Sequence, residues 1–171
     1  PMSAQKIRVI PFVEDHRNCL VLQPVGDLDL AAMASLESAL KAAIQVKYQL
    51  EDRELASEAL PGFNERKTLL FYESSEGGAG VLRRLVEDQR ALPTIARLAL
   101  EISHYDPVSL ADLRRAPRSR EDCDAACYDC LLSYSNQLDH THIDRHAIRD
   151  LLLDLATCTT AAGSGGRTRA E

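Results

Sequence analysis

The sequence lacks the features that identify membrane and exported proteins. No apolar run approaches the roughly 18–20 residues that a membrane-spanning helix needs. The N-terminal stretch PMSAQKIRV has no apolar signal core, so we expect a cytoplasmic protein whose cysteines stay reduced. Pro1 stands before Met2, which is consistent with a fragment of a longer protein.

The sequence also lacks a Walker A motif and any helicase motif, so ATP hydrolysis would reside in another domain or subunit. Basic residues are outnumbered by acidic ones, 20 to 26. The net charge of −6 excludes a protein that wraps nucleic acid over its whole surface and leaves room only for a local basic patch. The densest cationic stretch, LRRAPRSRED, carries Arg114, Arg115, Arg118 and Arg120. These arginines could contact a nucleic-acid backbone, and an ordinary solvated loop fits equally well.

The composition is that of one ordinary globular domain. The chain has 171 residues, of which 45% are hydrophobic and 27% charged, enough for one sizeable core. We expect a single α+β domain over residues 1–157, in which a small β-sheet packs with several helices. The Gly/Ser-rich segment 158–171 cannot bury enough apolar surface to order itself, so we expect a disordered tail.

The hydrophobic pattern places the elements of this domain. A hairpin is predicted from strands Ile7–Val13 and Cys19–Gln23 around the turn EDHRN, and a buried strand at 67–73. One long amphipathic helix is predicted within 26–60, with Asp27 or Asp29 as its N-cap. Further helices are predicted over 81–92, 93–104 and 106–116, and a last one begins near Thr141 with Asp144 completing a capping box.

Three of the five cysteines have the spacing C-x3-C-x2-C, as Cys123, Cys127 and Cys130. A tight C-x2-C turn can direct two thiolates at one tetrahedral ion, and a structural zinc site needs four ligands. We therefore predict a zinc knuckle at 120–145. The fourth ligand stays open among His140, His142, His146, Cys158 and Cys19. Two alternatives remain: small buried thiols, or a redox pair formed by Cys127 and Cys130.

The turn EGGAG lies between a predicted strand and a predicted helix, where backbone N–H groups can bind an anion. It lacks the G-K-[ST] ending, and Glu73 and Glu76 place negative charge where a phosphate would sit. Glycines that allow a sharp turn are the favoured interpretation. The rival interpretation is a metal-dependent nuclease or hydrolase that uses Glu73, the glycine turn, and His16 or His104.

The order FYESSEGGAG, C-x3-C-x2-C-L and N-Q-x2-H-x2-[IL]-D-R, the last at Asn136 to Arg145, resembles a known family. It is similar to the zinc-binding domain of unknown function at the C-terminus of bacterial and archaeal DEAD/DEAH-box helicases. That domain also occurs in the mitomycin-repair type of helicase and in the B component of the DISARM anti-phage system. The resemblance covers roughly Val9 to Leu155.

The resemblance implies a Zn²⁺ cofactor and a non-catalytic accessory domain that contributes DNA binding or assembly. Its implied partner is a DNA helicase or translocase, as a domain or a subunit, in DNA repair or anti-phage defence. DNA is a candidate ligand, and no membrane is involved. Helicase members have a fourth cysteine near the place of Asn136, which this chain lacks. The resemblance instead carries the fourth ligand role to His140, with His142 second.

Overall fold

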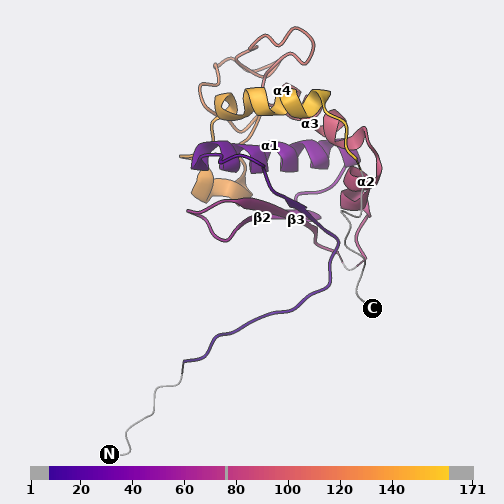
Figure 1. Cartoon of the computed structure of the whole chain (residues 1–171). Coiled ribbons are helices and arrows are strands. Elements are labelled where there is room, and N and C mark those ends of the chain that lie inside the picture. Colours follow the sequence, from indigo (N-terminus) through magenta and orange to yellow (C-terminus); the bar gives the residue numbers. More distant parts are fainter. Residues whose placement is uncertain (1–7, 76, 162–171) are drawn as a thin grey trace, which may run out of the picture.

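The computed structural model describes residues 8–75 and 77–161, and it is an α+β fold, as predicted. Figure 1 shows a small sheet with helix α1 lying over it and helices α3 and α4 on the far side of α1. The elements in chain order are β1 (Cys19–Leu22), α1 (Leu30–Tyr48), β2 (Leu55–Leu60), β3 (Thr68–Glu73), α2 (Val81–Glu87), α3 (Ala91–Ile102), the 3-10 helices η1 (Tyr134–Asp139) and η2 (Arg145–Ile148), and α4 (Arg149–Thr157).

The sheet is antiparallel with the strand order β1-β3-β2, so the buried strand β3 lies in the centre. Leu69, Phe71 and Glu73 alternate along β3 and are buried on the face covered by helix α1. Helix α1 begins at the N-cap Asp29, whose carboxylate accepts a hydrogen bond from the Ala32 amide. One hydrophobic core continues from the sheet through α1 and α3 to the cysteines and α4.

Two predicted elements near the N-terminus differ from the structure. The part of the predicted hairpin strand that is described, residues 8–13, forms no strand, whereas Cys19–Leu22 is strand β1. The predicted long helix ends at Tyr48, because Gln49 takes a left-handed conformation and closes the last turn. Residues Leu55–Leu60 then form strand β2, since they pair along the whole length of β3.

Two differences also occur in the second half of the chain. Residues 106–116 form turns instead of a short helix, because the backbone of Asp106 and Leu110 closes a local loop that ends in a bridge between Tyr105 and Asp112. The last helical segment begins later than predicted, and its cap is Asp144 acting on the amide of His146. Most of the predicted tail, 162–171, lies outside the described residues.

The glycine turn binds a carboxylate from its own chain. The Glu73 side chain is only 2% exposed and accepts hydrogen bonds from the amides of Gly80 and Leu82, each at 2.9 Å, at the start of helix α2. Asn18 donates a further bond to Glu73 at 3.3 Å. Burial alone would raise the pKa of Glu73, but these bonds outweigh it and lower the pKa. The Glu73 carboxylate thus occupies the place that an anionic ligand would need.

Substitution of Gly78 tests whether the Glu73 carboxylate needs its place at the glycine turn. The backbone of Gly78 has φ +55°, and a Cβ there would lie 1.8 Å from Oε2 of Glu73. We expect Gly78→Ala to lower the free energy of unfolding by about 2 kcal/mol or more, because the alanine is strained and also displaces the carboxylate. The matched control is Gly77→Ala, since Gly77 also has positive φ, +79°, but open space around it. Equal loss of stability in both variants, measured by urea unfolding, would contradict the role given to Glu73.

Candidate metal centre

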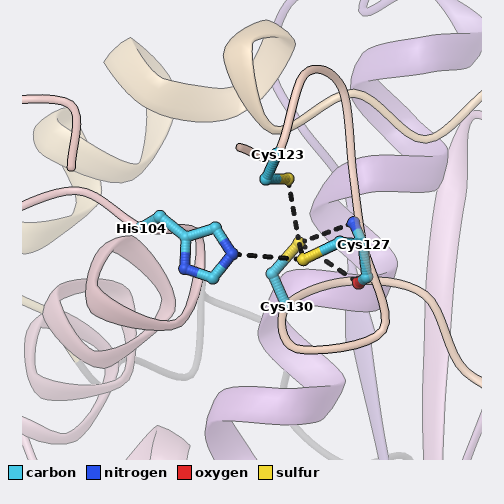
Figure 2. A group of neighbouring side chains, drawn as sticks. All are labelled: His104, Cys123, Cys127 and Cys130. Atoms are coloured by element: carbon cyan, nitrogen blue, oxygen red, sulfur yellow. Dashed lines mark hydrogen bonds between the residues drawn. The ribbon is translucent and has the colours of Figure 1, made fainter. Parts of the chain in front are cut away.

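The three knuckle cysteines converge on one point (Figure 2). Sγ of Cys130 lies 3.8 Å from Sγ of Cys123 and 3.5 Å from Sγ of Cys127. The Cys127 amide donates to Sγ of Cys130 at 3.0 Å, so the tight turn between these residues points a backbone N–H group at a sulfur. Cys123 and Cys130 are buried, which shields the group from water.

His104 completes the group from the end of helix α3. Its Nε2 lies 3.3 Å from Sγ of Cys127, and the four ligand atoms all lie within 4.8 Å of one another. The backbone of His104 has φ +63°, the left-handed conformation that often ends a helix and usually belongs to glycine. This conformation lets the chain leave the helix, and the 4% exposed imidazole faces the knuckle.

The spacing of these atoms fits a tetrahedral zinc ion. Zn–S bonds of about 2.3 Å and Zn–N bonds of about 2.0 Å place neighbouring ligand atoms about 3.5–3.8 Å apart. The three contacts given above, 3.8, 3.5 and 3.3 Å, lie close to these separations. Within the described part of the chain, no other group of three or more His, Cys, Asp or Glu side chains meets in this way.

Without a metal ion the buried members of this group are uncharged. Burial raises the pKa of the Cys123 and Cys130 thiols, so without a cation these sulfurs stay protonated at neutral pH. Burial, together with the positive charge of Arg145, lowers the pKa of His104. A neutral imidazole is the form that binds a metal, and a metal ion displaces the thiol protons because only thiolates are ligands.

His140, the predicted fourth ligand, lies outside this group in the structure. Its Nε2 is 3.0 Å from both the Ser133 carbonyl and the Asn136 side-chain oxygen, and its ring contacts Tyr128 edge-on. Asn136, at the place of the helicase members' fourth cysteine, instead holds the turn after the knuckle. Its side chain accepts from the Ser133 amide and donates to the Leu131 carbonyl.

The other candidate ligands are also elsewhere. His142 packs edge-on against Phe63, and His146 bonds to the Tyr105 hydroxyl and the Asp124 carbonyl. Cys19 is in strand β1, and Cys158 follows helix α4. The ligand candidates predicted from the sequence did not include His104, which the structure places in the cysteine group. No sequence spacing links it to the cysteines, so only the fold brings it there.

The four arginines Arg114, Arg115, Arg118 and Arg120 lie on the exposed loop 106–122, which leads into Cys123. The Cys123 amide donates to the Arg114 carbonyl at 2.6 Å, so the loop closes directly on the cysteine group. Arg115 pairs with Asp122 at 3.4 Å. Arg114, Arg118 and Arg120 have no carboxylate within ion-pair distance among the described residues.

The residues of the rival nuclease interpretation do not assemble into a site. The Glu73 carboxylate accepts hydrogen bonds from backbone amides at the start of helix α2. His16 is exposed in the N-terminal segment, and His104 faces the cysteines. Glu76 lies outside the described residues. The glycine turn and His104 therefore have separate roles, of which the first is structural and the second belongs to the cysteine group.

Comparison with known families identifies the class of this chain. Residues 36–131 match the family model described as the MrfA Zn-binding domain, and they make up more than half of the chain. The chain belongs to this family of zinc-binding domains. No curated protein and no solved structure matches it.

The matched segment also bears on the ligands. Residues 36–131 contain one histidine and three cysteines, and these are His104, Cys123, Cys127 and Cys130. His140, His142, His146, Cys19 and Cys158 all fall outside it. The histidine and the three cysteines inside it are the four residues whose ligand atoms the structure brings together. The described helices include none with the length and apolar character that a membrane span requires.

Proposed function

We propose that this chain is a zinc-stabilised accessory domain of, or partner to, a DNA helicase or translocase that acts in DNA repair or anti-phage defence. Membership of the MrfA Zn-binding domain family and the His/Cys₃ group support this proposal. One observation carries it: the cationic loop 106–122 is joined to the cysteine group through the bond between Cys123 and Arg114. A metal ion bound at the cysteine group can fix the conformation of this loop, whose surface would contact phosphate groups.

The zinc ligands in this proposal are His104, Cys123, Cys127 and Cys130. Zinc supplies four strong bonds that connect segments far apart in the sequence, and in such sites metal binding is coupled to folding. The end of helix α3 would then be tied to the knuckle and to the last helix. No disulfide joins any of the five cysteines in the structure, so the sulfurs of the group are available to a metal ion.

The loop offers surface for DNA and for a protein partner. Arg114, Arg118 and Arg120 bring positive charge that no carboxylate of the described residues pairs with, which favours contact with phosphate. Val108 and Leu113 on the same loop are 90% and 51% exposed. Exposed apolar side chains beside free arginines are typical of a contact surface with a protein, so helicase assembly is the second candidate role.

The ligand set predicts different effects for two histidines. Protein purified without added zinc should contain about one equivalent, measured by native mass spectrometry with a chelator control. His104→Ala should weaken zinc binding by more than the 10–100-fold that an outer partner of a ligand typically contributes. His140→Ala should keep the metal, because that ring is bonded to Ser133 and Asn136.

Cys127→Ser serves as the reference for loss of a ligand and should lose most of the zinc. A protein that keeps its melting temperature after the metal is removed would sink the zinc proposal, since binding and folding are coupled. Retention of zinc by His104→Ala together with its loss from His140→Ala would restore His140 as the fourth ligand.

DNA contact through the loop is tested by the adjacent pair Arg114 and Arg115. Each phosphate contact contributes about −0.7 to −0.9 to the slope of log K plotted against log salt concentration, where K is the DNA-binding constant. Replacing both arginines by alanine should therefore flatten the slope by up to about two units without changing the zinc content. The control is the exposed pair Arg83 and Arg84 on helix α2, whose replacement changes the net charge equally. Equal effects of both double variants on duplex and single-stranded DNA would leave partner assembly as the better function.

A further inference from the structure

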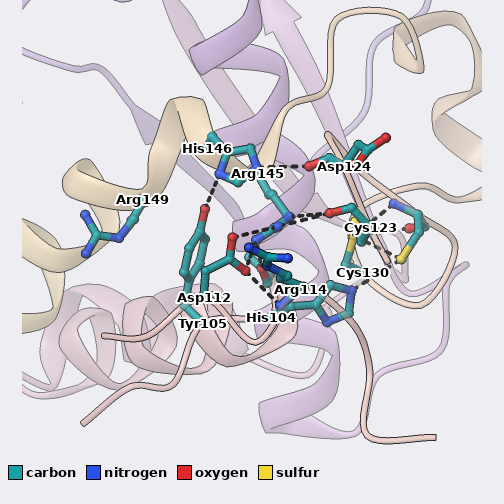
Figure 3. Close-up of polar contacts among 12 residues, drawn as sticks. His104, Tyr105, Asp112, Arg114, Cys123, Asp124, Cys130, Arg145, His146 and Arg149 are labelled. Carbon is teal, nitrogen blue, oxygen red and sulfur yellow. Dashed lines mark hydrogen bonds and ion pairs between the residues drawn. The ribbon is translucent and has the colours of Figure 1, made fainter. Parts of the chain in front are cut away.

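Arg145 is a buried charge next to the metal centre (Figure 3). Its side chain is 2% exposed, and it is the largest fully buried side chain of the described residues. A guanidinium buried in this way is stable only when its N–H groups have partners. Arg145 donates five hydrogen bonds to described residues, as many as its guanidinium has N–H groups.

These bonds hold two backbone carbonyls beside candidate zinc ligands. Nε and Nη2 of Arg145 donate to the Cys123 carbonyl at 3.2 and 3.0 Å. Nη1 donates to the Ser103 carbonyl at 3.4 Å, directly before His104. One planar group therefore fixes the backbone of the first cysteine and the backbone that leads into the histidine. These segments come from different parts of the chain, and their distance decides where Sγ and Nε2 lie.

The remaining donors of Arg145 reach loop 106–122. They form a two-pronged ion pair with Asp112, at 2.8 and 2.9 Å. Asp112 in turn accepts from the Arg114 amide at 2.8 Å, and the Arg114 carbonyl accepts from the Cys123 amide. A closed path of bonds thus runs from Arg145 through Asp112 and Arg114 to Cys123. The same guanidinium supports both the metal ligands and the base of the cationic loop.

We propose that Arg145 is the positioning residue of the metal centre and couples the ligand geometry to the shape of loop 106–122. The proposal rests on the ligand set given above. Arginine suits this role because its rigid fork binds carbonyls and a carboxylate at once, which a lysine ammonium cannot do. Three thiolates, a neutral imidazole and Zn²⁺ carry a single negative charge, so a cation beside Cys123 also balances the loaded centre.

Arg66 provides a matched control. Its side chain is also 2% exposed, and it donates to the Phe63 carbonyl at 3.0 Å and to the carboxylates of Glu37 and Asp139. None of these hydrogen bonds of Arg66 reaches His104 or the cysteines. Arg145→Lys and Arg66→Lys therefore remove the same fork from two buried ion pairs, and only one of these lies at the metal centre.

The experiment measures metal binding and loop protection in both variants. Zinc affinity is obtained by competition with a chelator, the visible spectrum of the cobalt-loaded protein reports ligand geometry, and trypsin cleavage after the loop arginines reports loop order. We expect Arg145→Lys to bind zinc about 10–100-fold more weakly, with an altered cobalt spectrum and faster loop cleavage. Arg66→Lys should lower the melting temperature but leave all three readouts close to those of the unmodified protein.

Unchanged zinc affinity and cobalt spectrum in Arg145→Lys would overturn the proposal, as would equal losses in both variants. If Arg145→Lys cannot be purified in a folded form, Asp112→Asn tests the proposal instead, because it weakens the Arg145–Asp112 ion pair without removing the arginine. Wild-type zinc affinity and wild-type loop protection in Asp112→Asn would overturn the proposal. His104→Ala separates this test from the ligand set. If it loses zinc while Arg145→Lys binds normally, the positioning role fails and the metal centre stands.

Discussion

The left-handed turn at His104 is the constraint on which the metal centre depends. Helix α3 is fixed because Ile95, Ala96 and Ala99 are fully buried between α1 and α4. Its last turn is therefore a rigid support, whereas the knuckle is a loop held mainly by its own turns. At φ +63° the chain reverses, and the imidazole reaches Cys127. A histidine in this conformation is strained relative to glycine, and such strain persists where the side chain has a use that glycine cannot provide.

The elements that the sequence predicted correctly are those set by local pattern. Strand β3 and helices α1 and α3 bury residues at the periods expected for strands and helices. Strand β2 was assigned to a helix because LASEAL consists largely of good helix formers. Its strand form depends on pairing with β3, a contact between distant residues that local pattern does not contain.

The same limit applied to the metal centre. Three of its members follow from the C-x3-C-x2-C spacing, because a tight turn brings such residues together without help from the rest of the fold. The fourth member of the group, His104, follows helix α3, and no spacing rule links it to Cys123. His140, the residue that the family pattern suggested, is close in sequence but turns towards Ser133 and Asn136. The zinc cofactor was therefore predictable, whereas the position of His104 beside the cysteines required the fold.

Glu73 and Arg145 are buried side chains of opposite charge, and each is stabilised by backbone groups of opposite polarity. Glu73 is an anion stabilised by amides at the start of helix α2, so the glycine turn directs the Gly80 and Leu82 amides at a carboxylate of its own chain. Arg145 is a cation stabilised by carbonyls and by Asp112. Its burial is favourable only while the Ser103 and Cys123 carbonyls and the base of loop 106–122 keep their places. The shape of the arginine-bearing loop 106–122 therefore depends on the buried centre beside it.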